Sequence, residues 1–248
     1  PFEGLTEEGQ APMRIKPIQL EDLLGREEIK INMEQIASQT NGKTILVTGG
    51  AGSIGSELIR QLARFNPGHI VIFDSAETPL HNLRLELEAK FPDLNFTAVI
   101  GDMRQRPRLE YIFRDFKPEI IFHAAAYKHV PLMEENPCEA IMTNVYGTKM
   151  LSKLALENEV ESFVMISTDK AVNPTNVMGA SKRIAEIFIQ SLARKAPREG
   201  MITRFVTTRF GNVLGSNGSV IPHFRKQIEN GGPVTVTHPE IIRYFMTI

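Results

Sequence analysis

From Lys43 onward, short apolar runs alternate with longer segments in which apolar and polar residues mix at helical spacing. The runs at 45–47 (Ile-Leu-Val) and 70–73 (Ile-Val-Ile-Phe) are continuously apolar, as expected for parallel strands buried on both faces. This alternation is typical of an α/β fold with a doubly wound parallel sheet, the Rossmann fold. The pattern predicts strands over 44–48, 69–73, 95–100, 119–123, 162–167 and 203–209, and helices near 53–65, 79–90, 106–115, 138–158 and 179–196.

A glycine-rich loop, Gly49-Gly50-Ala51-Gly52-Ser53-Ile54-Gly55, joins the first predicted strand to the helix after it. The first glycine of such a loop permits a tight turn, the second lets backbone N–H groups approach a pyrophosphate, and the third lets helix and sheet pack closely. The helix N-terminus adds N–H donors and a partial positive charge. Asp74 ends the next strand, at the spacing of about 20 residues where a carboxylate accepts both ribose hydroxyls of NAD and repels the 2′-phosphate of NADP. The sequence therefore predicts NAD binding, with NADP less favoured.

The two ends of the chain depart from the strand–helix rhythm. Residues 1–20 are polar with scattered prolines, and Leu20 to Ile36 carries apolar residues at mixed spacing among charges. A Gly/Asn/Ser/Pro-rich stretch follows Arg209 and extends through Pro222. We therefore expect a linker or arm with a short helix over 1–42, an NAD-binding domain over 43–210, and the start of a smaller substrate-binding lobe over 211–248. Because the sequence starts at Pro1 and stops inside an apolar run, we expect it to be a piece of a longer protein.

Composition narrows the classes of partner. The 248 residues carry a formal net charge of −1, which argues against nucleic acid as the main partner. Cys138 is the only cysteine, so intrachain disulfides and cysteine metal sites are excluded, as suits a reducing cytoplasm. His, Asp and Glu show no metal-ligand spacing, and no apolar run approaches the roughly 20 residues of a membrane helix. We expect no metal, no signal peptide and no membrane contact from these residues.

Candidate site residues follow the carboxyl ends of the predicted strands, where ligands bind in this architecture. Asp102, after the third strand, either accepts from the adenine amino group or only caps a turn. The alanines after the fourth strand leave room for a cofactor. Met178 and Lys182 are spaced to share one helix face. The expected cofactor-binding set is Gly49, Gly52, Ser53, Ile54, Gly55, Asp74, Ser75, Asp102, Met103, Ala124, Ala125, Ala126 and Lys182.

The segment 167–183, Ser-Thr-Asp-Lys-Ala-Val-Asn-Pro-Thr-Asn-Val-Met-Gly-Ala-Ser-Lys-Arg, resembles the extended short-chain dehydrogenase/reductases. Within them it resembles the nucleotide-sugar 4,6-dehydratases that act on UDP-N-acetylglucosamine in bacterial surface-polysaccharide and glycan synthesis. Most family members carry Tyr where this chain has Met178, which cannot exchange protons; Met is typical of the large, usually membrane-anchored branch. Segments 21–26, 124–131 and 209–216 agree, and the resemblance covers roughly residues 17–248.

The resemblance implies a catalytic set of Thr168, Asp169, Lys170, Met178 and Lys182. In such a dehydratase, hydride moves from sugar C4 to NAD, a base removes the C5 proton, an acid protonates the departing C6 hydroxyl, and the hydride returns to C6. The family assigns Asp169 as acid and Lys170 as base, although a free Asp is normally ionised and a free Lys protonated at neutral pH. Mutual attraction favours the ion pair of the two groups, whereas desolvation favours their neutral forms, and the sequence leaves open which effect is larger. Thr168, Lys182 and Lys128 all stay open as acceptors of the C4 hydroxyl proton.

The family places the UDP moiety at the loop after Arg209. The expected substrate contacts are Lys128, His129, Asn144, Asn212, Ser216, Ser219, Thr237 and Arg243. Arg243 is suited to bidentate phosphate binding, or is only a solvated surface charge. His129 is expected to be a supporting contact, since a lone histidine is usually an ordinary polar residue.

Two other functions stay open beside the 4,6-dehydration of a UDP-sugar. A nucleotide-sugar 4-epimerase shares the fold, cofactor and substrate class, but keeps the tyrosine base and has no need of Asp169 and Lys170. A non-catalytic dinucleotide-binding sensor explains the missing tyrosine but leaves Asp169, Lys170 and Lys182 unexplained. The resemblance further implies a homo-oligomer in the cytoplasm, or the cytoplasmic portion of an inner-membrane protein.

Overall fold

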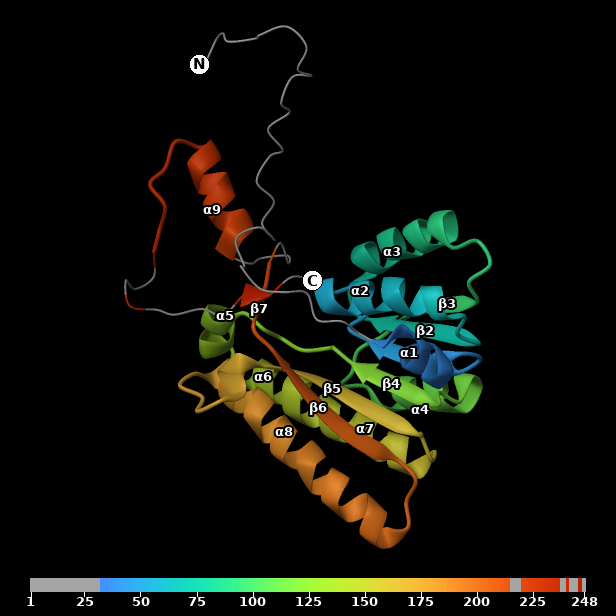
Figure 1. The fold of residues 1–248 in the computed structure, drawn as a ribbon. Helices are drawn as coiled ribbons and strands as arrows, with labels where there is room; N and C mark the ends of the chain where they lie inside the picture. Colours follow the sequence, from blue (N-terminus) through green and yellow to red (C-terminus); the bar gives the residue numbers. More distant parts are fainter. Residues whose placement is uncertain (1–31, 215–219, 237–239, 241–244, 247–248) are drawn as a thin grey trace, which may run out of the picture.

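The computed structural model describes residues 32–214, 220–236, 240 and 245–246, and its centre is a six-stranded sheet (Figure 1). All neighbouring strands of this sheet pair in parallel, in the order β3-β2-β1-β4-β5-β6. The order therefore reverses between β1 and β4. The strands are β1 (Thr44–Thr48), β2 (His69–Asp74), β3 (Phe96–Ile100), β4 (Ile120–His123), β5 (Ser162–Thr168) and β6 (Arg204–Phe210).

Helices cover both faces of this sheet, with α2 and α3 on one face and α4, α7 and α8 on the other (Figure 1). A further short parallel pair joins β7 (Asn212–Val213) to β8 (Phe245–Met246). The helices are α1 (Met33–Thr40), α2 (Ser53–Leu62), α3 (Glu77–Lys90), α4 (Arg106–Phe116), α5 (Val130–Glu135), α6 (Pro137–Ala140), α7 (Thr148–Glu157), α8 (Val177–Lys195) and α9 (Val220–Glu229).

The core has two halves because successive side chains of a strand point to opposite faces of the sheet. Ile45 and Val47 of β1 pack with Ile59 of α2 on one face. Leu46, between them, packs into the cluster on the other face together with Leu151 of α7. All five side chains are fully buried, which explains why the strands read as continuous apolar runs rather than as alternating ones.

The strand predictions are confirmed to within one residue at either end, and so is the doubly wound fold. One helix prediction needs correction. The single helix predicted over 138–158 is divided into α6, a π-helical segment (Ile141–Gly147) and α7. Helix α9, for which no helix was predicted, begins near the end of the Gly/Asn/Ser/Pro-rich stretch; its proline at 222 lies in the first turn, where a missing N–H costs no hydrogen bond. Residues 1–31, which include most of the predicted arm, lie outside the described residues.

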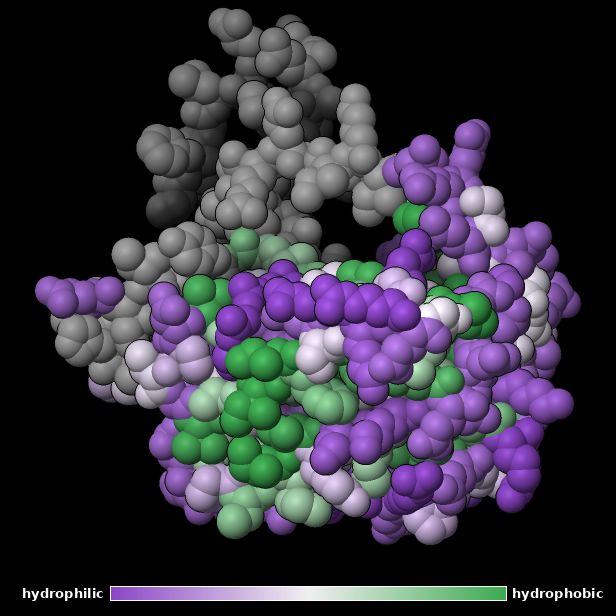
Figure 2. Space-filling model, turned by 90° about the horizontal axis from the view of Figure 1, so that it is seen from below, coloured by the Kyte–Doolittle hydropathy of each residue, from purple (hydrophilic) through white to green (hydrophobic). Residues whose placement is uncertain are grey.

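Seen from below, the surface carries a continuous apolar area among hydrophilic side chains (Figure 2). This is the side on which α7 and α8 cover the sheet (Figure 1). The exposed apolar side chains of the π-helical segment and α8 are Ile141, Met142, Tyr146, Ile184 and Ile187.

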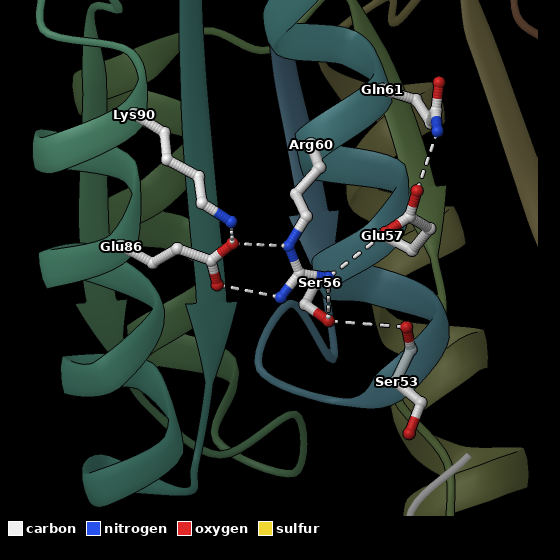
Figure 3. A network of polar contacts seen from close by, with 7 residues as sticks. All are labelled: Ser53, Ser56, Glu57, Arg60, Gln61, Glu86 and Lys90. Atoms are coloured by element: carbon white, nitrogen blue, oxygen red, sulfur yellow. Dashed lines mark hydrogen bonds and ion pairs between the residues drawn. The ribbon is translucent and has the colours of Figure 1, made fainter. Parts of the chain in front are cut away.

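A bidentate ion pair ties α2 to α3 (Figure 3). Arg60 donates from Nε and Nη2 to the two oxygens of Glu86, at 2.9 Å each, and Lys90 donates to the same carboxylate at 2.9 Å. The Arg60 guanidinium and the Lys90 amine lower the pKa of Glu86 to about 2. The third guanidinium nitrogen of Arg60, Nη1, donates to the Ser56 hydroxyl and to the Glu57 carboxylate. The contact fixes the helix whose first turn belongs to the glycine-rich loop.

A buried histidine joins the carboxyl ends of β1 and β4 to α7. His123 Nδ1 lies 2.7 Å from the Thr48 hydroxyl, and Nε2 lies 2.8 Å from the Thr148 hydroxyl. Thr148 uses its proton on the Asn144 carbonyl at 2.6 Å, so it accepts from His123. Nε2 therefore carries the imidazole proton and Nδ1 accepts from Thr48. Burial, with the nearby Lys182 cation, lowers the pKa of His123 to about 3, so the ring is neutral.

Truncation of Leu87, which is fully buried on α3, should lower the free energy of unfolding by about 2–5 kcal/mol, because Leu87→Ala removes contacts and leaves a cavity. Leu85 on the same helix is 51% exposed, and Leu85→Ala should change stability by no more than about 0.5 kcal/mol. Urea denaturation followed by circular dichroism measures both. Equal losses in the two variants would contradict the assignment of this face of α3 to the core.

His123 should make the protein acid-sensitive. Between about pH 6.5 and 3 the unfolded chain binds a proton at this histidine and the folded chain does not, so the stability contribution is complete above pH 6.5 and is lost as pH falls. Wild type should therefore lose up to about 1.4 kcal/mol per pH unit more than His123→Gln, whose amide can still bridge the two threonines. His81→Gln, at an exposed position of α3, serves as the control and should keep the wild-type slope. Parallel curves for His123→Gln and wild type would contradict this role.

Candidate active site

A cleft of about 550 Å³ opens at the carboxyl ends of β1, β4 and β5, where the strand order reverses. Four stretches of chain that are distant in sequence line it. They are the glycine-rich loop with the start of α2, the loop after β4, the end of β5 with the first turns of α8, and the chain after β6. The cleft lies where ligands bind in doubly wound sheets.

The glycine-rich loop has the backbone that its sequence predicts. Gly49 has a φ of 68°, in the left-handed region, and its N–H donates to the Phe73 carbonyl at 2.8 Å. A side chain at Gly55 would collide with the Gly49 carbonyl oxygen. Helix α2 begins at Ser53 with Gly52 as its N-cap residue, so no N-cap side chain covers the first turn. Gly49, Gly52, Ser53, Ile54 and Gly55 all line the cleft and form a cradle open to a phosphate group.

Asp74 holds this loop from the neighbouring strand. Its Oδ2 accepts from the Ala51 N–H and its Oδ1 from the Ala76 N–H, at 2.9 Å each. Each carboxylate oxygen retains a second lone pair for a ribose hydroxyl. Ser75, beside it, is exposed. The carboxylate thus has a structural contact that its spacing alone did not indicate.

Asp102 matches the turn-cap alternative. Its Oδ1 accepts from the Arg104 N–H at 2.8 Å, and the Arg104 side chain pairs with Oδ2 at 2.6 Å. The Arg104 guanidinium lowers the pKa of Asp102 below its ordinary value. Met103 is buried in the core, and neither residue lines the cleft described above.

The loop after β4 is shaped by Asn144, which was expected to contact substrate. Asn144 is fully buried instead. Its Oδ1 accepts from the Tyr127 N–H at 2.8 Å, while its Nδ2 donates to the Tyr127 carbonyl at 3.0 Å and to the Ser181 hydroxyl at 2.9 Å. The substrate-contact expectation is therefore corrected: Asn144 clamps the loop to α8. It does so from within the π-helical segment, whose wider turn points its side chain differently from an α-helix.

Two of the three alanines predicted to leave room for a cofactor lie at the cleft. Ala124 and Ala126 line the cleft, and Ala125 packs against Gly49 behind it. Lys128 and His129 follow at the exposed rim and also line the cleft. Partial desolvation lowers the pKa of Lys128.

The sequence Thr168-Asp169-Lys170 forms one hydrogen-bonded group at the end of β5. Asp169 Oδ1 accepts from the Thr168 hydroxyl at 2.9 Å and from Lys170 Nζ at 3.1 Å. Lys170 Nζ also donates to Asn212 Oδ1 at 3.3 Å. Thr168, Lys170 and Asn212 line the cleft, and Asp169 is hydrogen-bonded to the first two from behind this lining.

Met178 and Lys182 face the same cleft from α8, as their spacing predicts. Met178 is 2% exposed and packs with Met133 and Ala140. Lys182 is 4% exposed, and its Nζ donates to the Ile166 carbonyl at 2.7 Å. Burial lowers the pKa of Lys182 to about 8, against the opposing effect of the Glu186 carboxylate.

Several expected contacts fall outside the described residues: Ser216, Ser219, Thr237 and Arg243. Within the described ranges, no three His, Cys, Asp or Glu side chains gather as a metal site requires. No helix in the same ranges has the length and apolar character of a membrane span.

The comparisons with known proteins agree with this geometry. A family model described as polysaccharide biosynthesis protein matches residues 45–248. A capsular polysaccharide biosynthesis protein, CapD, of Staphylococcus aureus is 53% identical over 94% of this chain and 39% of its own length. An inverting UDP-N-acetylglucosamine 4,6-dehydratase of Campylobacter jejuni is 37% identical over 84% of this chain and 60% of its own. A UDP-glucose 4-epimerase of Rickettsia canadensis is 38% identical over 83% and 59%. The chain thus spans between two fifths and three fifths of the length of these relatives.

Among solved structures, DesIV of Streptomyces venezuelae, a dTDP-glucose 4,6-dehydratase crystallised with NAD, superposes with a TM-score of 0.69. It is 26% identical, over 82% of this chain and 67% of its own. The chain therefore belongs to the polysaccharide biosynthesis protein family, within the extended short-chain dehydrogenase/reductases that include nucleotide-sugar dehydratases and epimerases.

Proposed function

We propose that this chain is the cofactor-binding and catalytic part of an NAD-dependent UDP-sugar 4,6-dehydratase. Its substrate is UDP-N-acetylglucosamine and its product is UDP-2-acetamido-2,6-dideoxy-4-hexulose, used in bacterial surface-polysaccharide or glycan synthesis. The observation that carries the proposal is the hydrogen-bonded Asp169–Lys170 pair, whose Lys170 lines the cleft. The apolar Met178 lines the same cleft, where a hydride-transfer enzyme with a tyrosine base would need a phenol. The Campylobacter relative, named for this activity, supports the choice of sugar.

The residues of the cleft fit NAD. The turn at Gly49, the side-chain-free Gly52 and the open first turn of α2 leave backbone N–H groups facing the space that a pyrophosphate needs. Asp74 would hold the adenosine ribose, and Lys182 the nicotinamide ribose. When bound, NAD supplies the acceptor and later the donor of the hydride.

The protein side of the reaction is a proton cycle. The Lys170 amine takes the C5 proton, and the Asp169 carboxyl gives its proton to the departing C6 hydroxyl. As C6 is reduced, the Lys170 ammonium gives its proton back to C5. The proton released by the C4 hydroxyl then restores the Asp169 carboxyl, which shares a hydrogen bond of 2.9 Å with Thr168 and one of 3.1 Å with Lys170. The Thr168 hydroxyl, bonded to Asp169, is placed to orient a sugar hydroxyl and to relay its proton.

The two alternatives are weaker in different ways. An epimerase reading has the support of the Rickettsia relatives, but an epimerase needs no acid–base pair for C5 and C6. A non-catalytic sensor would leave unexplained why a carboxyl, an amine and a buried lysine meet at one cleft. Homo-oligomerisation and the cytoplasmic location stay predictions from the resemblance.

The dehydratase proposal predicts that the full-length protein converts UDP-N-acetylglucosamine to a product lighter by one water, with a new C6 methyl doublet in proton NMR. Asp169→Asn and Lys170→Ala should each lower kcat by about 10²–10⁴, the usual contribution of a general acid or base. Met178→Ala should cost less than about tenfold, because Met178 only fills space. The controls Asp93→Asn and Lys149→Ala, at exposed positions, should leave the rate unchanged.

Three outcomes would contradict parts of this proposal. A product of unchanged mass with an altered C4 proton would identify an epimerase. Bound NAD with no turnover of this sugar would favour the sensor or another sugar. A large loss of rate in Met178→Ala with NAD binding intact would refute its space-filling role.

Cofactor preference is predicted from Asp74. Titration should show NAD binding at least about tenfold more tightly than NADP, because the carboxylate repels a 2′-phosphate. Asp74→Ser should narrow this ratio, even if the lost contact with the Ala51 N–H weakens both affinities. Asp93→Ser, a control at an exposed position, should keep the ratio. Tighter binding of NADP by wild type would overturn the NAD assignment.

A further inference from the structure

Glu186 is a buried carboxylate that the proposed proton cycle does not use. It lies on α8 one turn after Lys182, and its side chain is fully inaccessible to solvent. Arg209 donates to it from Nε at 2.8 Å and from Nη2 at 2.6 Å, and Arg183 donates from Nη1 at 3.0 Å. Burial alone would raise the pKa of Glu186, but Arg209, the Ser167 side chain and Arg183 together outweigh it and hold the pKa below its ordinary value. Glu186 is therefore an ionised group inside the protein.

The Arg209 pairing reaches the substrate side of the cleft. Arg209 lies at the end of β6, paired in register with Ser167 of β5. The chain then passes through Phe210 and Gly211 to Asn212, and these three residues line the cleft. Asn212 accepts from Lys170 Nζ at 3.3 Å. The Glu186–Arg209 pair thus fixes the end of β6 against α8. Asn212, which contacts the proposed base Lys170, follows this strand end directly.

The same carboxylate also faces the cofactor side. Lys182 is bonded to the Ile166 carbonyl of β5, two residues before Thr168. The contacts therefore close a ring: Lys182 to β5, β5 to Lys170, Lys170 to Asn212, and Arg209 back to α8 through Glu186. The ring thus positions the amines of Lys170 and Lys182.

Glu186 also has an electrostatic effect on the buried Lys182 ammonium. A cation that is 4% exposed is unfavourable unless it is paired. The groups facing it are the Ile166 carbonyl of β5, the neutral His123 of β4 and Glu186 on its own helix. Among these only Glu186 carries a negative charge, and it favours the protonated amine. Arg183 and Arg209 face Glu186 itself.

We propose that Glu186 is a positioning residue of this active site: one turn along α8, its carboxylate sets a negative charge beside the buried Lys182 and, through Arg209, it holds the Asn212 contact of Lys170. This inference rests on the proposed dehydratase function for its effect on turnover. Its effect on cofactor binding does not depend on the identity of the sugar.

The test compares Glu186→Gln with wild type by NAD titration across pH 6–10 and by the pH profile of kcat with UDP-N-acetylglucosamine. Wild-type NAD affinity should fall above about pH 8, where Lys182 loses its proton. In Glu186→Gln this loss should begin at least about one pH unit lower, because a neutral amide no longer favours the ammonium. At neutral pH kcat should fall by at least about tenfold. Glu186→Asp, which keeps the charge, should restore the wild-type pH limb, a rescue that a packing role alone does not predict.

Arg209→Gln separates the two halves of the inference and stands in if Glu186→Gln fails to fold. Arg183 still pairs with the carboxylate, so the pH limb of NAD binding should stay in place while kcat falls, because the Asn212 contact is loosened. Glu157→Gln, on the exposed surface of α7, is the control. An unshifted pH limb in Glu186→Gln would overturn the charge role, and unchanged kcat in Arg209→Gln would overturn the role in holding Asn212. If wild type does not dehydrate this sugar but the NAD-binding limb moves, the proposed function fails and the positioning of Lys182 stands.

Discussion

The reversal of strand order between β1 and β4 is the constraint on which the rest of the molecule depends. The chain after β1 continues to α2 on one face of the sheet, and the chain after β4 and β5 continues to helices on the other face. The connections that leave β1 and β4 therefore diverge at the carboxyl ends of these two strands. The crevice left there is lined by loops, whose backbone N–H and C=O groups are not consumed by the sheet. A ligand can be held there by backbone alone, as at the glycine-rich loop, and by side chains delivered from several strands.

A crevice cut into the end of a sheet brings polar side chains close to the core, and each of them needs a partner. His123 is paired with two threonines, Asn144 with both backbone groups of Tyr127, and Lys182 with the Ile166 carbonyl. These pairings fix the walls of the cleft at single geometries, since a buried polar group left unpaired costs about 1–3 kcal/mol. The cleft walls thus have a defined geometry because the buried polar side chains behind them are stable only when they keep their hydrogen-bond partners.

Local signals in the sequence were enough for much of this arrangement. The glycine-rich loop could be predicted because each glycine is required by the conformation or packing of its own backbone. Asp74 could be predicted because β2 pairs with β1 in a register that brings its end beside this loop. Thr168, Asp169 and Lys170 are adjacent in the chain, so their meeting needed no knowledge of the fold. Asn144 and Glu186 could not be placed in the same way. The direction of Asn144 depends on a π-helical turn that a 3.6-residue period does not reveal, and the role of Glu186 depends on an arginine from another element. The role of Asp102 was ambiguous because its position after a strand suits both a turn cap and a contact with adenine. Spacing alone does not show that the Arg104 side chain pairs with the carboxylate.

Because Met178 stands where related enzymes carry a tyrosine, other residues must supply the proton chemistry of the phenol. A phenol at this position would lie on the same helix face as Lys182, where a cation lowers the cost of a phenolate and makes the pair an acid–base device. A thioether offers neither proton nor charge, so Met178 gives Lys182 no titrating partner. The carboxylate that balances the Lys182 charge is Glu186, one turn further along the same face of α8. In the proposed reaction, proton chemistry therefore comes from the end of β5, where Asp169 and Lys170 are in contact. The proposal assigns charge and cofactor binding to the buried Lys182, and proton transfer to the partly exposed Lys170.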